Sequence, residues 1–536
     1  MTAGAQEYAA LTAVAVVVAV TVLVASYGTR LSRTTGDFYV ASRSVRPWWN
    51  ASAIGGEYLS AASFLGVAGL VLLEGADALW FPIGYTVGYL LLLGFVAAPL
   101  RRSGAYTLPD FAEVRLGSAR ARRASALVVV VVGWLYLLPQ FTAAGLVWST
   151  ATGLPREVGT LVVAAVVAGA VAGGGMRSIT IVQAVQYWLK LTAIAVPACV
   201  LLALWGRQGA PVPPVPAGWG VPSAAPADLY GTYSLLLALL LGTMGLPHVL
   251  TRFYTNPDGT DARRTTRTVI GLLGLFYVWP PVYALLAWLW APGLAAPGRA
   301  ETVVVDLPAL ALPGAAGVVL SAVALGGAFA AFLSTASGLT VAVSGVLARD
   351  LVPGRLAGRL TGQGSGDPAA GRAGVARFRL ATLGALVVPV GVALVGVDVP
   401  LAATVGLAFA LAASTFAPLL LLGIWWDGLR TGPALLGMGA GGAAAALAAV
   451  LTLTGVSARA PVWLGEALAQ PAAWTVPLAA AVMVAGSLAV RARERRRDAP
   501  AEERPGLAPA LLHRPERAGS NGSGGAARRG APTARR

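Results

Sequence analysis

The sequence has few of the residues that most enzymes use for chemistry. Its 536 residues include one cysteine, Cys199, and two histidines, His248 and His513. A single cysteine excludes an intramolecular disulfide and any metal site built from several thiolates. Two histidines give no cluster for a catalytic metal and no basis for a Ser/His/Asp arrangement. We therefore expect no enzymatic activity, no resident cofactor and no catalytic metal.

Charge is also scarce. Charged residues make up 12% of the chain and hydrophobic residues 57%, and apolar runs recur from near the N-terminus to about residue 490. Runs of about 20 apolar residues are long enough to cross a bilayer as helices. The formal charge of +16 lies mostly in loops and in a C-terminal tail, where membrane orientation accounts for it, so we do not expect a nucleic acid partner. The pattern predicts an all-α polytopic membrane protein.

The length rule predicts about thirteen transmembrane helices. They are expected at 8–27, 48–73, 79–100, 125–151, 158–172, 179–205, 230–250, 268–290, 314–347, 380–397, 401–426, 433–454 and 474–490. Arginines concentrate in alternate loops, within 30–46, 101–123, 252–267 and 349–372. Since short cytoplasmic loops carry excess positive charge, this pattern predicts an external N-terminus and a cytoplasmic C-terminus.

The first apolar segment could be read as a cleaved signal peptide. Residues 1–7 carry no positive charge, however, and the basic cluster follows the segment, so we expect a retained helix. The tail at 491–536 is rich in Pro, Gly, Ala and Arg and is expected to be disordered. The dominance of arginine, alanine and glycine suggests a bacterial source, and hence a bacterial plasma membrane.

One expected span carries polar and helix-loosening residues at its centre. Gly55, Gly56 and Glu57 stand in the middle of the segment 48–73. Glycines weaken a helix and can free backbone carbonyls, and an ionisable residue inside a membrane indicates a functional site. This segment favours a transporter.

A second interruption occurs about five spans later, where Gly242, Gly245 and Pro247 precede His248. Matched interruptions in two halves of a chain are typical of inverted repeats, whose binding sites form at the broken helices. Close helix packing at the glycines, or a simple proline kink, is the alternative explanation.

The span 314–347 contains adjacent hydroxyls at Ser334 and Thr335, one turn beyond Ala331. Two hydroxyls with the Ala331 carbonyl and carbonyls from a broken helix supply about five neutral oxygens, which suit a sodium ion. Alternatively, these hydroxyls bond to carbonyls of their own helix or to a neighbouring helix.

Several motifs together resemble the sodium/solute symporter family, and within it the acetate and monocarboxylate permease branch. The resemblance covers residues 34–490. The matching stretches are Asp37-Phe38-Tyr39-Val40-Ala41, residues 55–66, Thr107-Leu108-Pro109-Asp110-Phe111, Gly174-Gly175-Met176-Arg177, Gly245-Leu246-Pro247-His248, Arg252-Phe253-Tyr254 and Leu333-Ser334-Thr335-Ala336-Ser337. The resemblance implies two inverted five-helix repeats in a leucine-transporter-like fold, with sodium entry coupled to solute uptake by alternating access.

The resemblance also implies a domain organisation and a sodium site. The expected segments are an N-terminal helix and basic loop (1–47), a first repeat (48–206), an external Pro-rich loop (207–229), a second repeat (230–426), two peripheral helices (427–490) and the tail (491–536). The implied sodium ligands are the carbonyls of Gly56, Leu59 and Ala331 and the hydroxyls of Ser334 and Thr335.

The chain departs from many relatives in the span 179–205, where Gln183 replaces an aspartate. Lys190, the one lysine of the chain, lies near the middle of this span. An ammonium there would cost at least ~2.5 kcal/mol on insertion scales, so it needs a partner, and Glu57 is the candidate. Proton coupling through Lys190 is an alternative to sodium coupling, and snorkelling or a water-filled cavity would also account for the lysine.

The predicted solute is a small monocarboxylate, with acetate first, because the ends of half-helices present amide donors to an anion. The residues expected around it are Tyr58, Ser60, Ser63, Gln140, Phe141, Thr243 and His248. His248 is expected to bond to the carboxylate, and the alternative is that it is a structural hydrogen-bonding residue. Pyruvate, propionate, proline, a sugar or a nucleobase stay open as solutes, and a membrane sensor built on a transporter-like domain is the alternative outside transport. The sequence does not indicate an oligomeric state.

Overall fold

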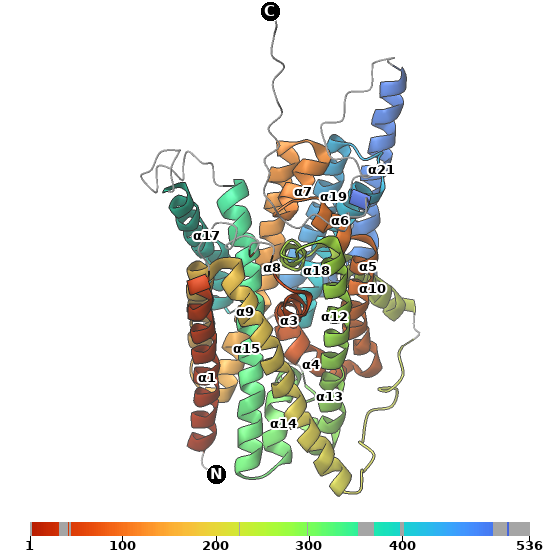
Figure 1. The fold of residues 1–536 in the computed structure, drawn as a ribbon. Helices are drawn as coiled ribbons and strands as arrows, with labels where there is room; N and C mark the ends of the chain where they lie inside the picture. The colour runs from red at the N-terminus through yellow and green to blue at the C-terminus, as the bar shows by residue number, and fades with distance from the viewer. Residues whose placement is uncertain are drawn as a thin grey trace, which may run out of the picture.

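The computed structural model describes residues 3–31, 41, 44–223, 226–296, 298–351, 369–396, 401–496 and 512–513. The regular structure in these residues is helical, and most helices run along one common direction (Figure 1). Residues 491–496 continue the last long helix. The other residues of the predicted disordered tail, apart from 512–513, lie outside the described part of the chain.

The helices follow one another in chain order. They are α1 (Ala3–Leu31), α3 (Pro47–Tyr58), η2 (Ala62–Gly66), α4 (Val67–Glu74), η3 (Gly75–Leu79), α5 (Trp80–Phe95), α6 (Ala97–Arg102), α7 (Leu108–Leu116), α8 (Ala119–Thr152), α9 (Arg156–Arg207), α10 (Pro226–Gly245), α11 (Pro247–Phe253), α12 (Gly259–Tyr277), α13 (Trp279–Trp290), η4 (Pro292–Leu294), η5 (Ala300–Thr302), α14 (Val303–Ala311), α15 (Ala315–Val346), η6 (Leu347–Leu351), α17 (Ala369–Leu394), α18 (Leu401–Trp425), α19 (Thr431–Leu453), η7 (Ser457–Arg459), α20 (Val462–Ala469) and α21 (Ala472–Arg496).

Ten helical segments of the described residues are long and apolar enough to cross a membrane, or eleven if the bent pair α10 and α11 is one span. This number is lower than thirteen because two of the segments each contain residues of two expected spans. One is 62–95, which joins the second half of the expected span 48–73 to most of the span 79–100. The other is α9, whose 52 residues would extend ~78 Å as a straight helix. Gly175 breaks α9 at φ 56° and ψ −154°, a conformation that favours glycine. The count of thirteen stays a prediction.

The two ends of the chain's helical part lie at opposite ends of the bundle. Helix α1 begins at one end, and α21 finishes at the other (Figure 1). An odd number of crossings would give this arrangement. Which end faces the cytoplasm stays a prediction from the arginine pattern.

The centre of the bundle is built from the interrupted helices and their neighbours. Helix α3 packs against α9, α12 and α15, while α10 packs against α5 and α18 (Figure 1). Helices α15 and α18 are enclosed over most of their length, whereas outer helices such as α1 expose large apolar side chains, including Leu23. Exposed apolar side chains on outer helices fit a lipid environment.

An ion cluster joins α7, α8 and η6 at one end of the bundle. Arg122 of α8 contacts Asp350 at 2.6 Å, Asp110 at 2.8 Å and Glu113 at 2.6 Å. The Asp350 side chain has no exposed surface, and Arg349 contacts Asp110 at 3.2 Å. A buried carboxylate is tolerated when such partners surround it.

Replacing Arg122 by glutamine should destabilise the protein by about 1–3 kcal/mol, because Asp350 would lose its main charged partner. Thermal unfolding of the detergent-solubilised protein measures the effect. The matched control is Arg264→Gln, which removes a pair whose arginine is 65% exposed and should change stability by less than about 0.5 kcal/mol. Equal effects of the two substitutions would contradict a structural role for the Arg122 cluster.

Candidate functional site

The first helix interruption lies just beyond its predicted position. Helix α3 continues through Gly55 and Gly56 and ends at Tyr58, and Leu59 leaves the helical region at φ −73° and ψ 84° before the chain resumes as η2 at Ala62. The Gly55 carbonyl still accepts a hydrogen bond from the Leu59 amide at 3.1 Å. Ala61 is already helical, so the interruption covers Leu59 and Ser60, and the prediction that it falls at Gly55 and Gly56 is wrong.

The two glycines have a packing role instead. A Cβ atom on Gly55 would lie 2.8 Å from the ring of Tyr187, and one on Gly56 would lie 2.0 Å from the carbonyl of Gln183. Both neighbours belong to α9. The glycines thus allow α3 and α9 to approach closely, so the carbonyls next to the interruption lie against α9.

The second interruption separates α10 from α11 at Leu246, between Gly245 and Pro247, with a bend of 44°. Pro247 has no amide hydrogen to continue the helix. Gly242 lies inside α10, where a Cβ atom would lie 2.6 Å from the Phe409 carbonyl of α18. Of the three residues predicted to break this span, Gly242 therefore serves packing.

The two interrupted spans are bonded to each other. The Tyr58 hydroxyl lies 2.9 Å from the Thr243 hydroxyl, and Asn50 of α3 donates to the Arg252 carbonyl of α11 at 2.9 Å. All four residues are buried. Movement of either span would therefore strain or break these hydrogen bonds unless the other span moved with it.

The Lys190 ammonium lies at the first interruption. Its Nζ atom donates to the Gly56 carbonyl, to the Leu59 carbonyl at 2.7 Å and to the Ser334 hydroxyl at 2.9 Å. The lysine has no exposed surface. An ammonium has three donors, and these contacts satisfy all of them. Lys190 is therefore neither snorkelling to the surface nor exposed to a cavity.

The other two predicted sodium ligands are bonded within the protein as well. The Ala331 carbonyl accepts from Ser334 at 3.1 Å, and Thr335 donates to the Glu57 carbonyl at 2.6 Å. The structure thus brings the five predicted ligands together where α3 and α15 meet. Because the ammonium already uses three of their oxygens, this arrangement does not fit a sodium ion.

Glu57 forms its ion pair with Arg252, whose Nε atom lies 2.6 Å from the carboxylate, and both side chains are almost fully buried. The predicted pair of Glu57 with Lys190 is therefore corrected. Arg252 also donates to Thr180 at 2.7 Å, to the Met176 sulfur at 3.0 Å and to Gln183. A guanidinium has five donors in a fixed planar fork, so it can serve several acceptors that a lysine could not.

Sequence reasoning assigned Arg252 to a basic cytoplasmic loop. The residue instead belongs to α11, the second half of the interrupted span, which carries it into the protein. The available signal was its position four residues after His248, which places both on one helix face. Gln183 links this pair to the lysine, since its amide nitrogen donates to the Ser334 carbonyl at 2.7 Å.

Gly338 of α15 provides a test of the Glu57 environment. A Cβ atom there would lie 2.0 Å from the Glu57 carboxylate and 2.6 Å from the Gln183 amide. Gly338→Ala should therefore displace both groups and destabilise the protein by about 1–3 kcal/mol, as overpacking does. Thermal unfolding checks this.

The control for Gly338 is Gly439→Ala on α19, where an added Cβ atom meets no neighbour within 4 Å. Alanine is the better helix former, so this variant should be unchanged or more stable by up to about 1 kcal/mol. If the two alanine variants unfold at the same temperature, a methyl group at position 338 does not collide with Glu57 and Gln183.

The residues predicted to surround a solute occupy several places in this region. Tyr58 and Thr243 form the bond between the spans, and Gln140 accepts a hydrogen bond from the amide of Ala61, directly after the interruption, at 3.1 Å. Ser60 is buried in the same interruption. The Ser63 hydroxyl lies 2.9 Å from that of Tyr277.

The last two residues predicted to surround a solute, His248 and Phe141, have different kinds of contact. His248 is fully buried, with its ring centroid 5.2 Å from that of Tyr136. Phe141 is buried, and its carbonyl accepts from Thr160 of α9 at 3.0 Å, a contact that indicates helix packing.

Aromatic residues that the sequence prediction missed complete the region. The ring of Tyr58 lies 4.9 Å from Tyr89, 5.8 Å from Tyr85 and 6.1 Å from Phe409, measured between centroids. Tyr85 and Tyr89 are one turn apart on α5, a spacing that could have indicated a shared face. Among the described residues, the buried hydroxyls of Tyr85 and Tyr89 and both ring nitrogens of His248 have no hydrogen-bond partner.

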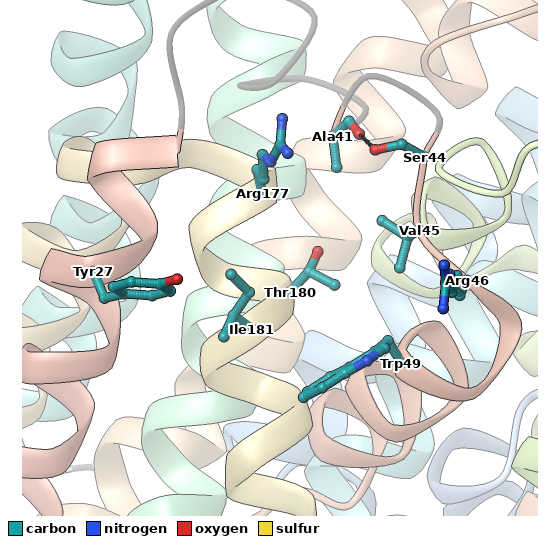
Figure 2. A pocket seen from close by; sticks show the side chains of 9 residues that line it. All are labelled: Tyr27, Ala41, Ser44, Val45, Arg46, Trp49, Arg177, Thr180 and Ile181. Atoms are coloured by element: carbon teal, nitrogen blue, oxygen red, sulfur yellow. Dashed lines mark hydrogen bonds between the residues drawn. The ribbon is translucent and has the colours of Figure 1, made fainter.

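A separate cavity of about 470 Å³ lies between α1, α3 and α9. Figure 2 shows Thr180 and Ile181 of α9 between Tyr27 of α1 and Trp49 of α3, with Arg46 at the start of α3. Thr180 also accepts the hydrogen bond from Arg252. The cavity therefore adjoins the buried Glu57–Arg252 pair through one shared residue.

Several known proteins are similar to this chain in sequence or in structure. An uncharacterized symporter of Bacillus subtilis, YwcA, is 30% identical over 430 residues, which are 78% of this chain and 82% of that protein. A Na+-coupled sialic acid symporter in a substrate-bound, outward-open state superposes with a TM-score of 0.64 at 14% identity, covering 93% of this chain and all of the other. Mhp1, a nucleobase-cation-symport-1 family transporter, superposes with a TM-score of 0.48 at 12% identity, covering 84% and 95% of the two chains.

The family comparison covers most of the chain. Residues 38–441 match the model of the sodium:solute symporter family. The match includes both interrupted spans, the hydroxyls of α15 and the lysine of α9. With its apolar helices, this multi-pass membrane protein belongs to the sodium:solute symporter family.

Proposed function

We propose that the protein is a secondary active symporter of a bacterial plasma membrane, which couples the entry of a cation to the uptake of a small monocarboxylate. Acetate is the first solute to test. Family membership supports symport, and sodium is the cation that this membership implies. The two interrupted spans support a solute path between them, because they meet at Tyr58 and Thr243 in the core of the bundle.

The observation that carries the solute class is a set of buried donors that have no hydrogen-bond partner in the described part of the chain. The hydroxyls of Tyr85 and Tyr89 and the ring of His248 are enclosed among aromatic rings. Buried polar groups without partners are rare and costly, so they indicate a ligand that bonds to them. A carboxylate offers only acceptors and would accept from a tyrosine hydroxyl and from an imidazole N–H.

The packing of the same region supports a small solute. The centroid of the Tyr58 ring lies 4.9 Å from that of Tyr89 and 6.1 Å from that of Phe409, and the His248 ring lies 5.2 Å from that of Tyr136. A carboxylate with a few carbons needs little displacement of these rings. A sugar would need more room and more hydrogen-bonding side chains, so the geometry favours acetate, propionate or pyruvate over the larger candidates.

The experiment is uptake of labelled acetate by proteoliposomes, with inward sodium and proton gradients imposed separately. Acetic acid crosses lipid unaided, so protein-free liposomes are measured in parallel and labelled pyruvate, a stronger acid, serves as a second solute. Unlabelled propionate, proline, glucose and uracil are added as competitors.

We expect protein-dependent accumulation that requires a cation gradient and is reduced by propionate and pyruvate. Accumulation inhibited only by proline, glucose or uracil would replace the proposed solute class. No protein-dependent uptake of any of these solutes, under either gradient, would contradict the proposal.

A further inference from the structure

We infer that the Lys190 ammonium is the cation of the site between α3 and α15, and that it keeps free sodium off the oxygens of Gly56, Leu59 and Ser334. This inference deepens the proposed function and rests on it, because it concerns the position at which a symporter of this family is expected to receive its ion. It makes Lys190 the residue that decides which cation the site accepts.

The geometry matches a bound cation in its choice of ligands. The ammonium contacts two main-chain carbonyls, one of them at 2.7 Å, and one hydroxyl at 2.9 Å. All three acceptors are neutral oxygens, and all three belong to the set that the family resemblance assigns to sodium. The side chain thus places a single positive charge where the free ion would lie.

The neighbouring charges are already balanced without Lys190. Glu57 is paired with Arg252 at 2.6 Å, and that arginine has further partners in Thr180, Met176 and Gln183. The ammonium is therefore held by carbonyl and hydroxyl dipoles, as a sodium ion at a broken helix would be. A second cation on the same oxygens would be repelled by the ammonium. It would also compete for oxygens that already accept hydrogen bonds from Lys190.

The lysine reaches this position where α3 and α9 are in close contact. A Cβ atom on Gly56 would overlap the Gln183 carbonyl of α9, and the Gly56 carbonyl is one of the three acceptors. Gln183 also bonds to the Ser334 carbonyl from the same face. The packing of α3 against α9 therefore directs Lys190 into the site. Its ammonium bridges the Gly56 and Leu59 carbonyls to Ser334 of α15, so no diffusible ion is needed there.

The test measures binding of radioactive sodium to the purified full-length protein at constant ionic strength, with choline replacing unlabelled sodium. The proteins are the wild type, Lys190→Ala, Lys190→Ala combined with Ser334→Ala, and Ser334→Ala alone. Lys190→Met, which keeps the length of the side chain without its charge, is a second variant in case Lys190→Ala does not fold. Thermal unfolding with and without sodium provides an independent readout.

We expect Lys190→Ala to gain saturable sodium binding, at least about tenfold tighter than in the wild type, with sodium raising its unfolding temperature. Adding Ser334→Ala should abolish the gain. Saturable binding to the wild type that Ser334→Ala weakens would overturn the inference, as would folded Lys190 variants that gain no sodium binding.

In solute uptake, strict sodium dependence of the wild type would overturn the inference yet leave the proposed symport intact, whereas sodium-independent uptake would support it. A complete lack of uptake contradicts the proposed function, and the binding assay still decides the inference.

Discussion

Arg252→Gln should destabilise the protein by about 3–5 kcal/mol, because it leaves the Glu57 carboxylate in the core without its charged partner. Arg252 and Glu57 are 1% and 2% exposed, so water cannot replace the lost contact. Gln183 and Thr180 would also lose their donor. Thermal unfolding in detergent, or the yield of monodisperse protein if the variant barely folds, measures the effect.

The control for this prediction is the double variant Glu57→Gln with Arg252→Gln. Two neutral amides can bond to each other, so the double variant should be more stable than Arg252→Gln alone. The pair would then show a coupling between its members that independent sites lack. Glu57→Gln alone is measured as well. If its stability loss and that of Arg252→Gln simply add in the double variant, Glu57 and Arg252 do not act as a pair.

His248→Ala should reduce the apparent affinity for the monocarboxylate by roughly 10- to 100-fold, since a hydrogen bond to a charged group contributes about 1.5–3 kcal/mol. The ring is fully buried, and its nitrogens have no partner among the described residues. His248→Gln should recover part of the loss, because its amide is again a donor. The concentration dependence of labelled acetate uptake measures both variants.

Tyr283→Phe is the matched control for His248. It removes another buried polar group, the hydroxyl that donates to the Ile194 carbonyl at 2.9 Å, at the contact between α13 and α9. This variant should lose some stability and leave solute affinity unchanged. Equal affinity losses in both variants would show that His248 acts through general stability, and the solute site would then lie elsewhere.

Much of the molecule could be predicted from local sequence. Apolar length predicted the helical membrane class, and Pro247 after Gly245 predicted the bend between α10 and α11. Matching the motif around Ser334 and Thr335 predicted which oxygens gather against α3. These features depend on residues that are near one another in the chain, or on motifs with a fixed order.

The rest depends on contacts between distant helices. Glu57 and Arg252 are 195 residues apart, so nothing near either residue indicates that they pair. Gly55 and Gly56 resemble helix breakers until Tyr187 and Gln183 of α9 are placed against them. Lys190 was correctly expected to need partners in the membrane, but its partners are main-chain carbonyls and a hydroxyl. Every residue has a main-chain carbonyl, so residue types do not indicate which carbonyls accept from the lysine.

If the interruption at residues 59–60 borders the solute path, the side chain of Ser60 must become accessible to water in at least one state of the transporter. Cys199, the single native cysteine, is first replaced by serine, and a cysteine is then introduced by Ser60→Cys. Labelling with a small charged thiol reagent is followed in proteoliposomes with and without solute. Ser414→Cys, at a buried bond between α18 and α21, is the unreactive control.

We expect Ser60→Cys to be labelled from water in at least one gradient condition and acetate or pyruvate to slow the labelling, while Ser414→Cys is not labelled. A folded Ser60→Cys protein that takes up solute, yet reacts with the reagent at the same rate with or without solute, would show that the interruption does not border the solute path.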